Sequence, residues 1–160
     1  MRGKREMLIR LLARAGLVRG ALAARRRVGL PWLTVVNYHR VGFRGAAGEL
    51  DDAVLDATPD QFDAQLSLLR EHFEVVGLED VVAWFRGAPL PPNPALVTFD
   101  DGYLDCVTTA LPLLQKHAVP ATFFLASTYI DDRRLFWWDR LALLLRRRGG
   151  AARGGAPSAR

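Results

Sequence analysis

Residues 95–105 read ALVTFDDGYLD, and this stretch decides how the rest of the sequence is interpreted. Its first five residues are apolar or β-branched without alternation, which predicts a buried strand. Two adjacent aspartates, Asp100 and Asp101, follow directly and lead into Gly102. Neighbouring carboxylates repel each other where water is scarce, so the pair indicates either a surface turn or a site for a cation.

Strand and helix patterns alternate on both sides of this stretch. Four short apolar segments predict strands, at 33–38, 73–77, 95–99 and 120–127. Four segments carry helical patterns, at 58–73, 78–87, 103–119 and 136–148. This alternation predicts βαβ units, a mainly parallel sheet and an α/β fold.

Several local features are also expected. A loop is predicted from the end of the first strand to about residue 57, and the helix at 103–119 is expected to break near Pro112. Trp137 and Trp138 could stack on a sugar ring, but they open an amphipathic helix, which favours core packing. Cys106 is expected to be a small buried residue.

Three polar residues come directly after predicted strands: Asp100, Asp101 and His39. Ligands of parallel α/β sheets bind beyond the carboxyl ends of the strands, so these three residues are expected at one functional edge. His72 and His117 instead close helices that precede strands, which places them at the opposite edge. Only one histidine is therefore positioned for chemistry.

The chemistry that suits two adjacent aspartates is metal-assisted hydrolysis. One carboxylate can ligate a divalent cation while the other stays off the cation and acts as a base for the bound water. Gly102 allows a sharp turn at this point. A plain Asp-Asp-Gly turn, with an aspartate capping the next helix, remains the alternative.

Charge is segregated along the chain. Residues 1–27 carry a net charge of +8 and residues 133–160 carry +7, whereas residues 28–132 carry −10. A nucleic-acid binder usually has its basic patch on the folded domain. The acidic central body therefore argues against a nucleic-acid partner.

The N-terminal segment, residues 1–27, predicts a basic amphipathic helix. Arginines interrupt its apolar residues, so it has neither the apolar core of a cleavable signal peptide nor a transmembrane span. Packing on its own domain, peripheral contact with an anionic membrane and nucleic-acid binding remain open as roles for this helix. Cys106 is the only cysteine, which excludes an internal disulfide and fits a reducing compartment. We expect a cytoplasmic or peripheral membrane location.

The stretch ALVTFDDGYLD resembles the first motif, TFDDG, of the polysaccharide deacetylases, the NodB-homology domains of carbohydrate esterase family four. Three further stretches resemble the same family in the same order: LTVVNYHRV at 33–41, VPATFFLASTYI at 119–130 and LFWWDRL at 135–141. The resemblance covers about residues 32 to 145.

The resemblance implies a (β/α) barrel that hydrolyses carbon–nitrogen bonds other than peptide bonds, removing N-acetyl (or O-acetyl) groups from an acetylated polysaccharide or glycan. It implies a divalent metal cofactor, commonly zinc. By position, Asp100 would be the catalytic base and Asp101 a metal ligand. His39 would be an active-site residue or a neighbour of the metal ligands.

The sequence also departs from the family pattern. The family's second motif, H-[ST]-x-x-H, supplies two histidine ligands and does not occur here. We therefore expect a partial barrel of about four strands, truncated and without a complete metal site. The expected division is a basic helix at 1–30, the N-terminal half of a deacetylase-like domain at 31–148, and a disordered tail at 149–160. A non-catalytic carbohydrate-binding or membrane-associated module is the alternative function.

Overall fold

The computed structural model describes residues 16–28, 32–46, 48 and 50–153. Most of the predicted N-terminal helix and the last seven residues of the predicted tail thus lie outside the described residues. The chain groups into two compact units. Unit 1 contains the described parts of 1–36, 64–98 and 114–122, and unit 2 contains those of 37–63, 99–113 and 123–160.

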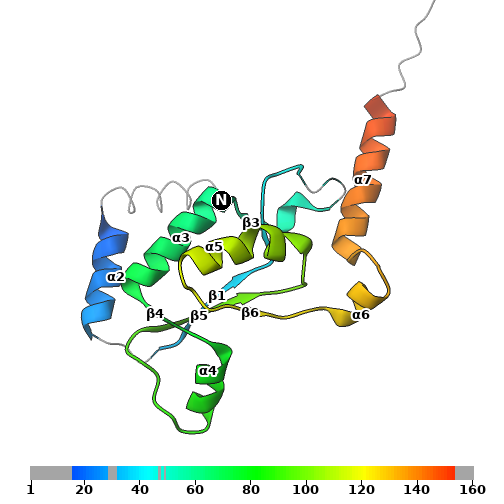
Figure 1. Cartoon of the computed structure of the whole chain (residues 1–160). Helices are drawn as coiled ribbons and strands as arrows, with labels where there is room; N and C mark the ends of the chain where they lie inside the picture. The colour runs from blue at the N-terminus through cyan, green and yellow to red at the C-terminus, as the bar shows by residue number, and fades with distance from the viewer. Residues whose placement is uncertain (1–15, 29–31, 47, 49, 154–160) are drawn as a thin grey trace, which may run out of the picture. The chain divides into compact units, whose positions relative to one another are not determined.

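The fold is α/β, as predicted, and its elements are shown in Figure 1. The helices are α2 (Leu17–Val28), α3 (Pro59–His72), α4 (Leu78–Phe85), α5 (Leu111–Lys116), α6 (Ser127–Asp131) and α7 (Trp137–Arg153). The strands are β1 (Thr34–Tyr38), β2 (Arg40–Val41), β3 (Leu55–Ala57), β4 (Glu74–Val76), β5 (Pro94–Phe99) and β6 (Thr122–Phe123).

The four predicted strands correspond to β1, β4, β5 and β6, and these form one sheet. Its order is β1-β5-β4, with β6 also paired to β5. β4 and β5 run parallel, with Val75 opposite Ala95 and Val76 opposite Leu96. All six residues of β5 are buried, which explains its unbroken apolar sequence.

Unit 1 is built around β4, β5 and helix α4. Val76, Val81 and Leu96 form its apolar core, with Leu33 packed against them. Helix α4 ends where Gly87 adopts a φ of 98°, a left-handed conformation that suits glycine at a helix end.

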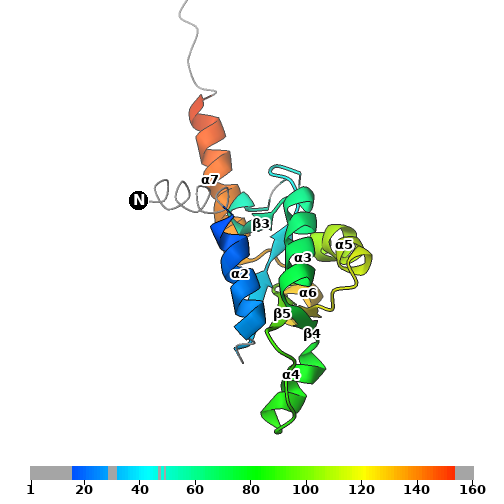
Figure 2. The same cartoon turned by 90° about the vertical axis from the view of Figure 1, so that its left-hand side faces the viewer.

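Helix α2 is tied to unit 1 by its arginines. The Arg25 guanidinium donates to Asn93 Oδ1 (2.6 Å) and to Thr34 Oγ1 (2.7 Å), and Arg26 donates to the carbonyl of Glu71 at the end of α3. α2 and α3 accordingly lie side by side in Figures 1 and 2. Part of the basic face of α2 thus forms hydrogen bonds with other residues of the chain. Within the described residues, no helix has the length and apolarity needed to cross a bilayer.

The core of unit 2 is aromatic. Phe62 of α3 is fully buried and lies edge-on to Tyr38 (ring centroids 4.9 Å apart) and to Phe99 (5.9 Å). Phe99 in turn stacks on Phe123 at 4.9 Å. The ends of β1, β5 and β6 are thus held together by rings that also fill the core.

A buried carboxylate joins α7 to the rest of unit 2. Asp139 is fully buried, and its two oxygens accept hydrogen bonds from the Asp51 backbone N–H and the Tyr103 hydroxyl, each 2.7 Å long. The Trp138 indole N–H donates to the same hydroxyl oxygen at 2.8 Å. Burial, followed by the hydrogen bond to Asp139, raises the pKa of Tyr103.

The prediction of a loop up to residue 57 is wrong, because this segment contains the parallel strand pair β2 and β3. β2 has two residues and β3 has three, too few for a recognisable alternation in the sequence. The pair is formed by Arg40 opposite Leu55 and Val41 opposite Ala57. A 3-10 turn at Asp52–Val54 leads into β3.

The expected helix break near Pro112 is also wrong, because the helix widens instead of breaking. A π-helical turn, Cys106–Ala110, runs directly into α5, and the Leu111 N–H bonds to the Cys106 carbonyl, five residues back. Proline has no N–H to donate, and a π turn accommodates this without ending the helix. Cys106 is buried, as predicted.

Two further boundaries differ from prediction. β6 contains only Thr122–Phe123 of the strand expected at 120–127, because Pro120 lacks an N–H and α6 begins at Ser127. α7 extends to Arg153, so residues 149–153 are helical where disorder was expected. Helix α7 starts with apolar residues and continues through the small residues 149–152, since glycine and alanine can continue a helix that has already formed.

β1 and Trp137 are less buried than expected. β1 alternates between half-buried and exposed residues up to buried Tyr38, so it is not apolar-packed on both faces. Trp137 is 65% exposed, which rules out core packing for this residue, whereas Trp138 is half-buried. Trp138 occupies the inward position at the start of α7, and its immediate neighbour therefore points elsewhere.

We predict that Phe62→Ala lowers the free energy of unfolding by about 3–5 kcal/mol, because it empties the centre of the aromatic core. Urea denaturation followed by circular dichroism measures this change. Phe85→Ala is the matched control, since Phe85 is 79% exposed, and it should change stability by less than about 0.5 kcal/mol. Equal losses for the two variants would contradict the proposed core.

We also predict that Asp139→Asn lowers the free energy of unfolding by about 1–3 kcal/mol. The amide keeps the shape but presents one oxygen instead of two, so a buried donor, either the Asp51 N–H or the Tyr103 hydroxyl, loses its acceptor. Tyr103→Phe removes the hydroxyl that donates to Asp139. Because the two residues share this hydrogen bond, the loss of stability in the double mutant should be smaller than the sum of the two single losses. Fully additive losses in the double mutant would contradict the network.

Candidate functional site

The predicted residues lie together in unit 2, where β1 and β5 end. The Asp100 N–H donates to the Tyr38 carbonyl at 2.8 Å, so the residue after β5 is paired with the last residue of β1. Asp100 is further held by Asn37, whose side-chain amide donates to its Oδ2 at 2.8 Å. One carboxylate is therefore fixed at the edge of the sheet by a neutral donor.

The backbone reverses sharply after Asp100. Asp101 and Gly102 have φ values of 72° and 78°, both left-handed, and the Gly102 N–H bonds to the Asp100 carbonyl at 2.9 Å. This conformation is unfavourable for residues with a side chain other than asparagine or aspartate. A Cβ on residue 102 would also lie 2.9 Å from Leu125 Cδ2. Glycine at position 102 is thus favoured mainly by the left-handed conformation, since the end of the exposed Leu125 side chain can move aside.

The Asp101 carboxylate has an oxygen without a partner. Its Oδ2 is buried and has no hydrogen-bond partner in the part of the chain that the structure describes. Burial raises the pKa of Asp101 most strongly; Asp100 and Asp139 raise it further, while His39 lowers it. A buried acceptor left unsatisfied is costly, so the site suits a bound cation or proton donor.

His39 lies close enough for its charge to act on Asp101. Asp56 of β3 holds this histidine, because Asp56 Oδ2 accepts the His39 backbone N–H at 2.6 Å and lies 3.4 Å from its Nδ1. The imidazole remains partly exposed. The structure therefore brings His39, Asp100 and Asp101 together; their chemical roles stay predictions.

An ion pair lies next to the turn. The Arg40 guanidinium is buried, donates from Nε to Asp105 Oδ2 at 2.8 Å and lies 5.0 Å from the Tyr103 ring centre. Burial raises the pKa of Asp105 in spite of Arg40, which acts in the opposite direction. The pair joins β2 to the start of the following helix.

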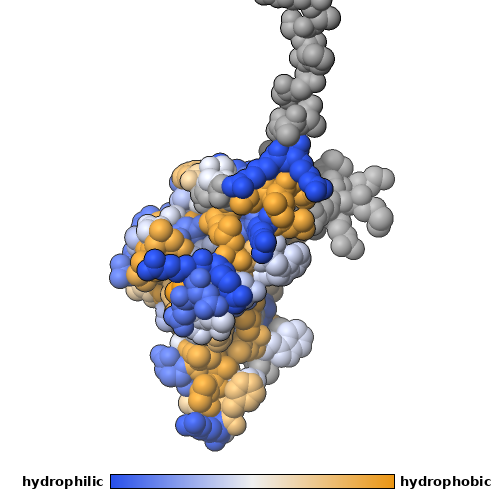
Figure 3. Space-filling model, turned by 90° about the vertical axis from the view of Figure 1, so that its right-hand side faces the viewer, coloured by the Kyte–Doolittle hydropathy of each residue, from blue (hydrophilic) through white to orange (hydrophobic). Residues whose placement is uncertain are grey.

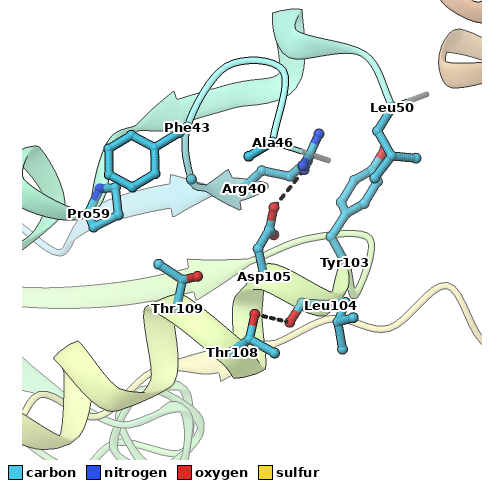
Figure 4. Close-up of a pocket in the computed structure, with 11 residues that line it drawn as sticks. Arg40, Phe43, Ala46, Leu50, Pro59, Tyr103, Leu104, Asp105, Thr108 and Thr109 are labelled. Atoms are coloured by element: carbon cyan, nitrogen blue, oxygen red, sulfur yellow. Dashed lines mark hydrogen bonds and ion pairs between the residues drawn. The ribbon is translucent and has the colours of Figure 1, made fainter. Parts of the chain in front are cut away.

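Figure 4 shows a pocket of about 420 Å³ at this ion pair. Its walls are mostly apolar, and Arg40, Tyr103 and Asp105 supply the polar edge. Neither aspartate of the turn nor His39 lines it. The pocket and the predicted residues thus occupy different places in unit 2. Asp105 Oδ1, at the pocket, is likewise buried without a described partner, so the choice of the turn rests on the meeting of Asp100, Asp101 and His39 there.

A divalent metal fits this site only in part. Asp101 offers a buried oxygen that needs a partner, which is what a metal ligand would show. No group of three or more His, Cys, Asp or Glu side chains among the described residues is arranged to hold a metal ion. A catalytic zinc usually takes three protein ligands. The described residues therefore offer two candidates, Asp101 and at best His39 as a second, and not a complete set.

Three residues of the site were missed from the sequence. Asn37 was a detectable signal, because an amide side chain stands inside the apolar run 33–38, which His39 follows directly. Asp56 and Asp139 gave none, since only long-range pairing brings Asp56 to His39 and Asp139 to Tyr103.

Comparisons with known proteins show similarity to deacetylases. The family profile described as polysaccharide deacetylase matches residues 87–149. Poly-beta-1,6-N-acetyl-D-glucosamine N-deacetylase of Escherichia coli (strain K12) is 27% identical over 107 residues, which cover 63% of this chain and 15% of that protein. The chain thus spans a small part of the length of this relative.

Solved structures show the same fold. IcaB from Ammonifex degensii superposes with a TM-score of 0.55 at 29% identity, over 66% of this chain and 42% of that chain. A de-N-acetylase from Aggregatibacter actinomycetemcomitans superposes with a TM-score of 0.53 at 24% identity, over 62% and 39% respectively. The chain is thus similar to polysaccharide deacetylases in sequence and in fold, over part of their length.

Proposed function

We propose that this chain supplies part of the active site of a metal-dependent deacetylase that removes acetyl groups from N-acetylated sugars of a polysaccharide. The observation that carries the proposal is the Asp101 carboxylate, held in a left-handed turn with a buried oxygen that lacks a partner. The name of the Escherichia coli relative, a poly-beta-1,6-N-acetyl-D-glucosamine N-deacetylase, supports the substrate class.

The reaction is the hydrolysis of an amide. A water oxygen adds to the acetyl carbonyl carbon, and the carbon–nitrogen bond then breaks while the nitrogen takes up the proton that the water lost. Acetate and a free amine are released. Asp100 is assigned to accept the proton that the attacking water loses. The Asn37 amide bonds one Asp100 oxygen, which orients the carboxylate and leaves its other oxygen for the proton.

Asp101 is assigned to hold a divalent cation, zinc being the ion that the family resemblance implies. Such an ion supplies positive charge that stabilises a negatively charged carbonyl oxygen. His39, oriented by Asp56, is the nearest described candidate for assisting Asp101. Because two candidates are fewer than the three ligands of a catalytic zinc site, we propose that this chain alone binds zinc weakly and does not deacetylate.

We predict that Asp101→Asn stabilises the metal-free chain at pH 7. The folded state raises the pKa of Asp101, so wild type loses stability as the pH rises from the unfolded-state pKa, about 3.9, through the folded-state pKa. The variant should therefore be more stable than wild type at pH 7. Well below pH 4 Asp101 is protonated in both states, so there the two proteins should be equally stable. Asparagine also tolerates the φ of 72°. Urea denaturation at several pH values measures the difference.

Zinc provides the second arm of this experiment. Added zinc should raise the stability of wild type slightly and leave Asp101→Asn unchanged, because a ligand stabilises only the state that binds it. A variant that is less stable than wild type at every pH would assign Asp101 a structural role. A tight one-to-one zinc site in wild type that Asp101→Asn abolishes would refute weak binding.

We further predict different effects of the two aspartates in a chimera that joins residues 31–148 to the C-terminal part of a related deacetylase domain. Asp101→Asn should lose bound metal and activity together. Asp100→Asn should keep the metal and lose about 10²–10⁴-fold in turnover, the contribution of a positioned base. Metal content by mass spectrometry and turnover on an N-acetylated oligosaccharide separate these roles.

The reverse pattern, in which Asp100→Asn loses the metal and Asp101→Asn keeps it, would invert the assignment. Asn37→Ala is a graded control, since it frees Asp100 without removing a carboxylate. It should retain the metal and lower turnover less than Asp100→Asn does. Retention of metal and activity by both aspartate variants would show that the pair is only a turn.

A further inference from the structure

The first turn of α7 places one acidic side chain in the interior of unit 2. The outer surface around α6 and α7 alternates between apolar and strongly hydrophilic patches (Figure 3). Asp139, on the inner side of α7, is by contrast 0% exposed. Burying a carboxylate completely is costly even when its oxygens are hydrogen-bonded, and an apolar residue would fill the same space at lower cost. Packing alone therefore does not explain an aspartate at this position.

One oxygen of Asp139 holds the segment that follows the acidic turn. Its Oδ2 accepts the Tyr103 hydroxyl at 2.7 Å, and the backbone of Tyr103 directly follows Gly102. The Tyr103 side chain is buried, and its hydroxyl oxygen also accepts the Trp138 indole N–H at 2.8 Å. The exit of the turn that presents Asp101 is thus fixed to α7 by two neighbouring residues.

The other oxygen of Asp139 holds the segment that leads to His39. Asp139 Oδ1 accepts the Asp51 backbone N–H at 2.7 Å. Asp51 caps the short 3-10 turn that runs directly into β3. β3 carries Asp56, whose Oδ2 accepts the His39 backbone N–H at 2.6 Å. A single carboxylate therefore connects the two segments that place Asp101 and His39, the two described ligand candidates.

The charge of Asp139 also acts on the turn. Burial raises the pKa of Asp101 most strongly, His39 lowers it, and Asp100 and Asp139 raise it further, so the charge of Asp139 reaches Asp101. In the metal-free chain this repulsion is unfavourable. When a cation is bound at Asp101, the same negative charge attracts the ion. The position of Asp139 thus favours the occupied site over the empty one.

We propose that Asp139 is a positioning residue of the metal site, which sets the turn at Asp101 through the Tyr103 hydroxyl and strengthens cation binding there. Asp139 is not assigned as a ligand, since both of its oxygens are bonded to other groups of the chain. The inference rests on the proposed function and deepens it, because it makes the metal affinity of Asp101 depend on a residue of α7. Groups that hold or surround metal ligands typically change the affinity by about 10- to 100-fold.

The test follows zinc binding to the full 160-residue chain by NMR, using the backbone amide signal of Gly102 without denaturant. Asp139→Asn should raise the zinc Kd at least about tenfold, because it removes the charge and weakens the hold on the turn. Tyr103→Phe keeps the charge and removes only the hydroxyl. It should raise the Kd about threefold, the loss expected for one hydrogen bond. If Asp139→Asn does not fold, Tyr103→Phe decides the question alone.

Val76→Ala is the control for a merely structural effect. Val76 belongs to the apolar core of unit 1, whereas the turn belongs to unit 2, and its truncation also destabilises the chain. The zinc Kd and the metal-free Gly102 signal of Val76→Ala should match those of wild type. Asp139→Asn and Tyr103→Phe should both shift that metal-free signal, because both release the exit of the turn. Circular dichroism shows whether each variant is folded at the temperature of the titration.

Failure of this inference is distinguishable from failure of the proposed function. If Asp101→Asn abolishes the zinc response, a wild-type Kd in folded Asp139→Asn or in Tyr103→Phe would overturn the inference and leave the metal role of Asp101 intact. An equal loss of affinity in Val76→Ala would also overturn it, because any destabilisation would then weaken the site. A wild-type chain that shows no zinc response, or the same response as Asp101→Asn, would reject the metal role of Asp101 and the inference with it.

Discussion

The backbone has to leave a fully buried strand and reverse within three residues, and the site depends on this constraint. β5 contributes six buried residues, and Asp100 still pairs with the end of β1. Left-handed conformations at the next two residues then turn the chain, and the second of them is a glycine. The same reversal places two carboxylates at the carboxyl edge of the sheet, where parallel α/β folds bind their ligands.

Stability and chemistry are supported by different interactions in unit 2. The aromatic core around Phe62 and the two hydrogen bonds of Asp139 satisfy every group that they involve, so they stabilise the unit directly. Asp101 does the opposite, since its buried oxygen has no described partner and its charge lies near other carboxylates. Asp105 Oδ1 in the same unit is also buried without a described partner, but the Asp101 oxygen lies in the turn where the cation is proposed to bind. A buried, unsatisfied carboxylate there costs stability, as expected of a site prepared for a cation.

The similarity to polysaccharide deacetylases, with the proposed function, gives these observations a common explanation. The shared fold accounts for the order of the strands, and the proposed hydrolysis accounts for Asp100 beside Asp101. It also gives a use to Asn37 and Asp56, which orient Asp100 and His39 without filling the core. The pocket at Arg40 and Asp105 lies outside this explanation and belongs to the packing of β2 against the following helix.

The α/β class, four strands of one sheet and the edge at which Asp100, Asp101 and His39 lie could be predicted from the amino-acid sequence. Each of these follows from local information: apolar runs, turn residues and the position of a polar residue relative to a strand end. The pairing of β2 with β3, the bonds of Asp56 to His39 and of Asp139 to Tyr103, and the exposure of Trp137 beside packed neighbours became visible only in the folded chain. The contacts join residues 15 to 36 positions apart, and the exposure of Trp137 depends on which side of a helix start faces the core; neither leaves a periodic pattern in the sequence.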